Sequence, residues 1–174
     1  MPTNTQEAMK GTTVKSLNAY EVISRHQVEP PIDVKAIAEA LGVKVWEARL
    51  PEDISGKLIP DPVNGGGAGY SILVNGAEGF TRKRFTIAHE LAHFILHRRQ
   101  IESGIIDNVL YRSGLSTLQE SQANRLAADI LMPRHLVAKI FAKNTNHDIE
   151  VISNFFMVSP AAMKIRLGQL ALAS

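Results

Sequence analysis

The stretch "RFTIAHELAHFILH", residues 84–97, decides how the rest of the chain is interpreted. At about 100° of rotation per residue, a helix over residues 82–97 gathers its apolar side chains into one stripe. His89 and His93 are four residues apart at the edge of that stripe, so both imidazoles can reach one metal ion. Glu90 lies further round the helix, where it can act as a general base on a water molecule bound to the metal. The pattern predicts a catalytic metal site on a helix that packs against the core.

A further histidine, His97, lies on the same helix but is a poor candidate for a ligand. A rise of about 1.5 Å per residue places it roughly 12 Å along the axis from His89. One ion with bonds of about 2 Å cannot join both side chains. We expect His97 to end the helix and to interact with the terminal carbonyl groups.

The third ligand has to come from another segment, because a catalytic zinc ion usually takes three protein ligands and one water. Residues 118–133 form a second amphipathic helix in which Glu120 lies at the flank of the apolar stripe. On residue pattern alone Glu120 is only slightly favoured over Asp107 and Asp129. Asn124 follows Glu120 by one turn and can orient a ligand from there.

The bulk composition restricts the class of protein. The 174 residues include 45% hydrophobic and 21% charged residues, which is typical of a globular chain with a real core. The formal charge is +2 and the pI is about 9.0, which does not by itself indicate nucleic-acid binding. Cysteine is absent, so disulfides and cysteine-ligated zinc are excluded. Without a signal peptide or a long apolar run, we expect a cytoplasmic protein with no membrane span, in an oligomeric state that the sequence leaves open.

Secondary structure outside the two motif helices follows from periodicity and from glycine and proline positions. Helices are expected over residues 14–27 and 32–42, and strands over residues 43–50, 55–60 and 69–75. The glycine-rich stretch "NGGGAG" precedes the last strand. It lacks the strand–loop–helix context of a phosphate loop, so we interpret it as a flexible connection.

The C-terminal stretch, residues 149–170, is typical of two helices joined by a short turn. Ser159 can cap the second helix and Pro160 fits its first position. DNA recognition requires exposed basic side chains, and the second helix offers only two basic residues, Lys164 and Arg166. We therefore expect these helices to pack on the domain or to contact a protein, with DNA binding unlikely, and we expect Lys164 and Arg166 to be dispensable for stability.

Two motifs in the right order make the chain resemble the ImmA/IrrE metallopeptidases. They are "RFTIAHELAHFILH" and "E-x-x-x-N-R-L-A-A-D-I-L-M-P", and the resemblance covers about residues 31–133. It implies that His89, His93 and Glu120 bind a single zinc ion and that Glu90 is the catalytic glutamate. Gln122 departs from the family, whose members often carry an acidic residue there.

The resemblance also implies a fold and a domain organisation. It implies an α+β fold, a small zincin-like domain. A three-stranded antiparallel or mixed sheet packs on the histidine helix, with helices at both ends of the chain. We expect a flexible tail at residues 1–13, the metallopeptidase domain at 14–133 and a C-terminal helical segment at 134–174.

The implied activity is that of a zinc-dependent endopeptidase, with a helix-turn-helix repressor or antitoxin as substrate in a stress response. Family members are often encoded in bacteria or phages beside such a repressor. One alternative is a proteolytically silent toxin or binding module on the same fold. Another is a DNA-binding regulator that acts through residues 148–170.

Two parts of the mechanism stay open at this stage. The group that stabilises the oxyanion is unknown, and the candidates are Tyr70, Tyr111, Arg82 and His135. The strand at residues 69–75 is a candidate sheet edge for pairing with the substrate backbone.

Overall fold

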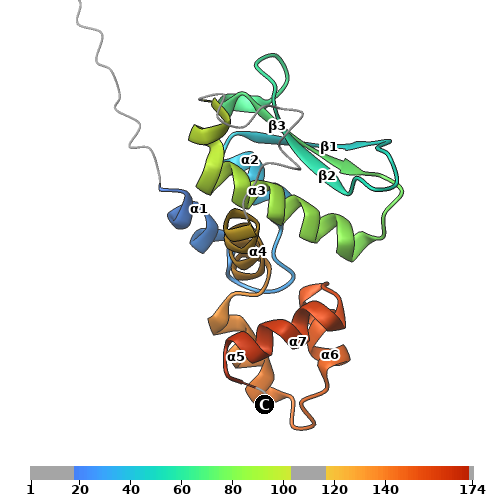
Figure 1. Cartoon of the computed structure of the whole chain (residues 1–174). Coiled ribbons are helices and arrows are strands. Elements are labelled where there is room, and N and C mark those ends of the chain that lie inside the picture. Colours follow the sequence, from blue (N-terminus) through green and yellow to red (C-terminus); the bar gives the residue numbers. More distant parts are fainter. Residues whose placement is uncertain (1–17, 103–116, 173–174) are drawn as a thin grey trace, which may run out of the picture.

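The computed structural model describes residues 18–102 and 117–172 (Figure 1). The tail expected at residues 1–13, together with Asp107 and Tyr111, lies outside the described residues. The described elements are α1 (Ala19–His26), α2 (Val34–Ala40), β1 (Val43–Ala48), β2 (Gly56–Pro60), the 3-10 turn η1 (Gly66–Ala68), β3 (Tyr70–Asn75), α3 (Phe80–Glu102), α4 (Thr117–Leu131), α5 (Arg134–Lys143), α6 (Ile149–Phe156) and α7 (Pro160–Gln169). The α+β class is confirmed.

The three strands form a mixed sheet in the order β1-β3-β2, with β1 parallel and β2 antiparallel to β3. The inner strand β3 is buried almost throughout, and Ile72 and Val74 are fully covered. Because β3 is hydrogen-bonded on both sides, the prediction that residues 69–75 offer a sheet edge is wrong. The edges of this sheet are β1 and β2.

The glycine-rich segment before β3 is a hydrogen-bonded turn and not the loose connection expected from its composition. The Gly65 amide donates to the Asp61 carbonyl over 2.8 Å, and the Ala68 amide donates to the Gly42 carbonyl over 2.9 Å. A side chain at Gly65 would collide with the backbone of Asp61 and Tyr70. The glycines therefore serve a close approach of backbone segments at the start of β1.

Helix α3 lies between the sheet and α4 (Figure 1). Its apolar stripe includes Ala88, Leu91 and Ala92, which are fully buried in the common core. The helix begins and ends beyond the predicted residues 82–97, so His97 does not end it. The expected contact of His97 with terminal carbonyls is therefore wrong.

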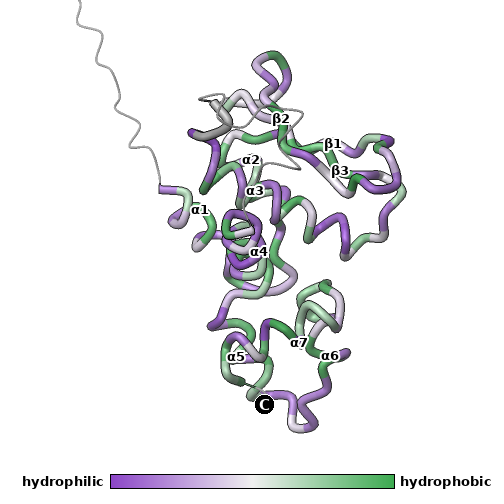
Figure 2. The backbone as a smooth tube through the Cα atoms, viewed as in Figure 1, coloured by the Kyte–Doolittle hydropathy of each residue, from purple (hydrophilic) through white to green (hydrophobic). Residues whose placement is uncertain are grey.

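Helices α5, α6 and α7 lie together at the end of the molecule away from the sheet (Figure 1), and hydrophobic residues run through α6 (Figure 2). The predicted cap of α7 is confirmed, because Ser159 Oγ accepts from the Ala162 amide over 3.2 Å and Pro160 opens the helix. Phe156 and Met163 are fully buried. No helix in the described part of the chain has the length and apolar character needed to cross a membrane.

The contacts of Arg166 contradict the expectation that it is a dispensable basic residue. Its side chain is 4% exposed, its Nε donates to the Met132 carbonyl over 2.9 Å, and its guanidinium lies 2.6 Å from Asp129. A guanidinium can be buried where carboxylate and carbonyl oxygens meet its donors. Counting basic residues in the sequence could not reveal those partners, which lie in and just beyond α4.

Candidate metal centre

The two histidines of α3 point their ring nitrogens at one place. His89 Nε2 and His93 Nε2 are 3.0 Å apart, and the two ring centroids are separated by 4.6 Å. The helix itself produces this geometry, because side chains four residues apart are neighbours on its surface.

The first turn of α4 brings Glu120 to the same place. One carboxylate oxygen lies 3.4 Å from His89 Nε2, and the other lies 3.4 Å from His93 Nε2. Within the described residues, His89, His93 and Glu120 offer ligand atoms that all lie within 4.8 Å of one another. Asp129 is instead engaged with Arg166 at the other end of α4. Of the two acidic candidates that the structure describes, it is Glu120 that meets the histidines.

Neighbouring side chains determine which ring nitrogens carry protons. Asn124 Oδ1 lies 3.0 Å from His89 Nδ1, and an amide oxygen only accepts, so His89 is protonated on Nδ1. Gln122 Oε1 lies 3.3 Å from His97 Nε2, and His97 Nδ1 lies 3.0 Å from His93 Nδ1. In the orientation of these amides, His97 donates to Gln122 and accepts from His93 Nδ1–H. Both Nε2 atoms at the site can then act as electron-pair donors to a metal ion.

The donor atoms and their spacing suit a metal ion. Two imidazole nitrogens and a carboxylate face one another at 3.0 and 3.4 Å. The negative carboxylate favours a cation at this place, and imidazole nitrogens can bind one. Ligands at about 2.0–2.1 Å from a tetrahedral ion are themselves roughly 3.3 Å apart. The donor set and the spacing therefore fit a zinc ion held by two histidines and a glutamate.

Burial keeps both histidines neutral, which is the form that binds a metal. Burial, together with the repulsion that a protonated His89 or His97 would exert, lowers the pKa of His93 to about 3. The pKa of His89 is also lowered, chiefly by burial, although the Glu120 carboxylate opposes that shift. A ring that resists protonation keeps its lone pair available near neutral pH.

Glu90 and the three candidate ligands share a cavity of about 380 Å³. The Glu90 side chain is 7% exposed and lies on the wall of the cavity beside His89 and His93. Ser55 and Gly56 form another part of the wall, at the start of β2. These two residues were missed by sequence analysis, because nothing in "SGKLIP" indicates that this strand borders the histidines.

Arg82 is the candidate oxyanion group that the structure brings to this cavity. Tyr70 is 6% exposed and packs edge-on against Phe94, with ring centroids 5.3 Å apart. His135 Nε2 contacts the Gln27 carbonyl at 3.0 Å. Neither residue lines the metal cavity.

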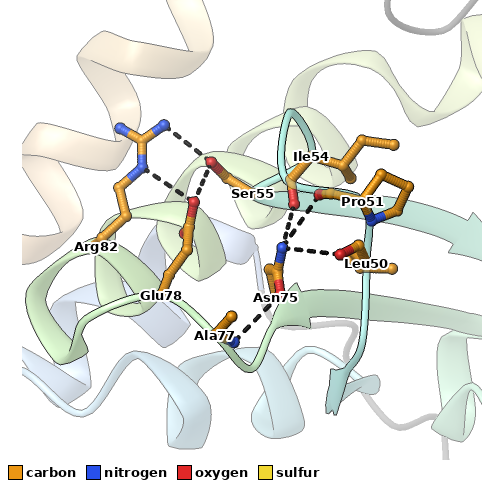
Figure 3. A network of polar contacts seen from close by, with 8 residues as sticks. All are labelled: Leu50, Pro51, Ile54, Ser55, Asn75, Ala77, Glu78 and Arg82. Atoms are coloured by element: carbon orange, nitrogen blue, oxygen red, sulfur yellow. Dashed lines mark hydrogen bonds and ion pairs between the residues drawn. The ribbon is translucent and has the colours of Figure 1, made fainter.

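A polar network holds Arg82 and the cavity wall in place (Figure 3). Arg82 donates to Ser55 Oγ over 3.0 Å, and its Nε lies 3.8 Å from Glu78. Ser55 Oγ donates to the same Glu78 carboxylate over 2.6 Å. The Asn75 amide donates to three carbonyl oxygens of the preceding loop, those of Leu50, Pro51 and Ile54. The loop before β2 is thus fastened to the end of β3.

The chain is similar to known proteins in sequence and in fold. The model of a peptidase family described as the IrrE N-terminal-like domain matches residues 38–168. A solved structure described as a Mycobacterium tuberculosis transcriptional regulator has a TM-score of 0.61 at 18% identity, over 86% of this chain and 45% of that protein. At this identity the likeness shows the fold alone, and the chain spans less than half of that regulator. No curated protein matches the sequence.

Proposed function

The chain belongs to the IrrE N-terminal-like peptidase family, and we propose that it is a zinc-dependent endopeptidase that cleaves a partner protein. The family supports a metallopeptidase or regulator-cleaving role in general. One observation carries the more specific proposal. Three possible ligand atoms, from His89, His93 and Glu120, converge beside the Glu90 side chain in a cavity.

In this proposal His89, His93 and Glu120 hold the zinc ion. The ion, when bound, supplies Lewis acidity that polarises a carbonyl group and makes water more acidic. Asn124 holds the His89 ring in orientation through its contact with Nδ1, and His97 does the same for His93.

Glu90 is the proposed catalytic residue. It does not belong to the ligand group, yet it lines the same cavity, so it can accept a proton from a water molecule there and return it to the leaving amine. Arg82 is the proposed donor to the developing oxyanion, because its guanidinium lines this cavity and is held by Ser55 and Glu78.

The substrate backbone has a sheet edge available at β2. This strand pairs with β3 on one side and ends the described sheet on the other, and its first residue lines the metal cavity. An extended peptide added to this edge would pass the ligands and Glu90. We propose β2 as the strand that binds the substrate.

Replacement of Glu90 by glutamine tests the chemistry separately from binding. Glu90→Gln retains the shape of the side chain but removes the base, so cleavage of a bound partner should fall by at least about a hundredfold. Zinc content, measured by metal analysis, should remain that of the wild type. Cleavage at the wild-type rate by Glu90→Gln would exclude Glu90 as the base.

For the substrate we propose a helix-turn-helix repressor or antitoxin encoded beside this protein. The direct experiment is to incubate the product of the neighbouring gene with the zinc-loaded chain and identify fragments by mass spectrometry. If wild type and Glu90→Gln both bind the partner and neither cleaves it, the chain acts as a binding module or toxin.

A DNA-binding regulator is less well supported, because α7 buries one of its two basic side chains, Arg166. Specific DNA binding is typically about 10⁻⁸ M or tighter at physiological salt. A mobility shift with operator DNA that reached this range and disappeared with Lys164→Ala would favour the regulator.

A further inference from the structure

A second, smaller cavity adjoins the metal cavity on the side of the C-terminal helices. It has a volume of about 260 Å³, which suits one side chain and not a longer segment of peptide. Its walls come from α3 and from the turn and first half of α7, with Phe85, Val158, Ala162 and Ile165 as apolar members. The mechanism proposed above makes no use of this cavity.

Phe85 and Arg82 belong to both cavities, so the two spaces share a wall. The Phe85 ring is stacked near the imidazole of His89, with centroids 6.3 Å apart. An extended peptide advances by about 3.3–3.6 Å per residue, so a peptide bound in the metal cavity can reach the shared wall within a few residues. A peptide with its scissile bond at the ligands would place a neighbouring side chain at this cavity.

The chemistry of the walls selects an apolar side chain. Most of the surface that the wall presents to the cavity is apolar, and the Ser159 hydroxyl already caps α7. Ile165 is 64% exposed and borders this cavity, so its side chain is accessible to a ligand. Contact with an apolar ligand side chain would cover it.

We propose that this cavity is a specificity subsite that accepts an apolar side chain within a few residues of the cleaved bond. The inference rests on the proposed endopeptidase function and deepens it by naming the substrate class. The C-terminal helices then do more than close the core, because α7 takes part in selecting the substrate.

Peptide hydroxamates test the subsite without requiring a known substrate. A hydroxamate chelates zinc, and acetohydroxamate reports on the metal alone. Peptide hydroxamates that differ only in one side chain, Leu, Phe, Asp or Lys, report on the adjoining cavity. The zinc-loaded wild type should bind the Leu and Phe probes about tenfold or more tightly than the Asp and Lys probes, because burial of a large apolar side chain favours binding.

Two variants with the same change in charge provide the control. Ile165→Asp introduces a carboxylate at the wall of the cavity and should abolish the preference for Leu and Phe. Val151→Asp makes a similar change on α6, at a residue that is 43% exposed and does not line the cavity. It should bind the whole probe series as the wild type does. Acetohydroxamate should bind all three proteins equally, and thermal unfolding should confirm that they are folded.

The outcomes separate this inference from the proposed function. If acetohydroxamate binds but the wild type shows no preference among the peptide probes, or if Ile165→Asp keeps the preference, the subsite is wrong and the metal site stands. If the protein takes up no zinc and binds no hydroxamate, the proposed metal site fails and the subsite fails with it.

Discussion

The two ends of helix α4 bury polar groups in opposite ways. Near its first turn, Glu120 approaches His89 and His93 of α3, and three side chains that can bind a metal ion face one another. Near its last turn, Asp129 approaches Arg166 of α7, and a cation meets a carboxylate. His93 is 1% exposed and Arg166 is 4% exposed, so burial does not distinguish the two ends.

The difference lies in the chemistry of the groups that face one another. At the Arg166 end, donors and acceptors match, and the result is a stable attachment of α7 to α4. At the His93 end, three side chains of the kinds that bind metal ions converge, so a cation suits the set. A cluster of metal-ligating side chains is thus a better indication of a functional site than a matched ion pair.

The largest effect should come from exchanging the two acidic residues of α4 for alanine. Glu120→Ala should weaken zinc binding by more than about a hundredfold, because even outer contacts of a zinc site are worth about tenfold to a hundredfold. Asp129→Ala should leave zinc affinity unchanged. Competition with a chromophoric chelator measures both. Equal zinc affinity in the two variants would remove the distinction between the ends of the helix.

A second comparison uses the two basic residues of α7. Arg166→Ala should lower the free energy of unfolding by about 2 kcal/mol, since it leaves the Met132 carbonyl and the half-exposed Asp129 without their partner. Lys164→Ala, at an exposed position, should change it by less than about 0.5 kcal/mol. Denaturant unfolding of metal-free protein gives both values. If Arg166→Ala leaves the free energy of unfolding unchanged, the contacts of Arg166 do not attach α7 to α4.

A smaller effect is expected where Gln122 supports the metal site through His97. Gln122→Leu removes the acceptor and should weaken zinc binding by about tenfold at most, because Gln122 is exposed and water can replace part of the contact. Gln122→Glu restores an acceptor and should recover the wild-type affinity. In Gln122→Leu the Nδ1 atom of His93 should lose part of its proton occupancy, which the ¹⁵N NMR chemical shifts of the ring report. Identical behaviour of Leu and Glu variants would exclude this chain of contacts.

A last prediction concerns the pH dependence of metal-free protein. Because the pKa of His93 in the folded protein is about 3, below its ordinary value, the unfolded state binds the additional proton between these values. Stability is therefore complete above about pH 6.5 and decreases as the pH falls, by at most about 1.4 kcal/mol per pH unit for this group. His93→Asn should show a shallower dependence in thermal unfolding. A metal-free wild type that is equally stable at pH 4 and pH 7 would contradict the buried neutral ring.

Much of the site follows from the sequence because a helix fixes the relation of nearby residues. The spacing of His89, Glu90 and His93 determines that two imidazoles share one direction whatever the helix packs against. The three strands were predicted within a few residues for a similar reason, since each is bounded by glycine, proline or asparagine. The family resemblance, now confirmed, rested on the same local motifs.

Relations between segments were decided only by the tertiary structure. The residue pattern left Glu120, Asp107 and Asp129 open, and it was the crossing of α4 over α3 that brought Glu120 to the histidines. The order of the strands made β3 internal, and the packing of α7 buried Arg166 against α4. Periodicity identifies which face of an element is apolar, but not which element covers it. Contacts between residues distant in sequence depend on the packing of the whole core.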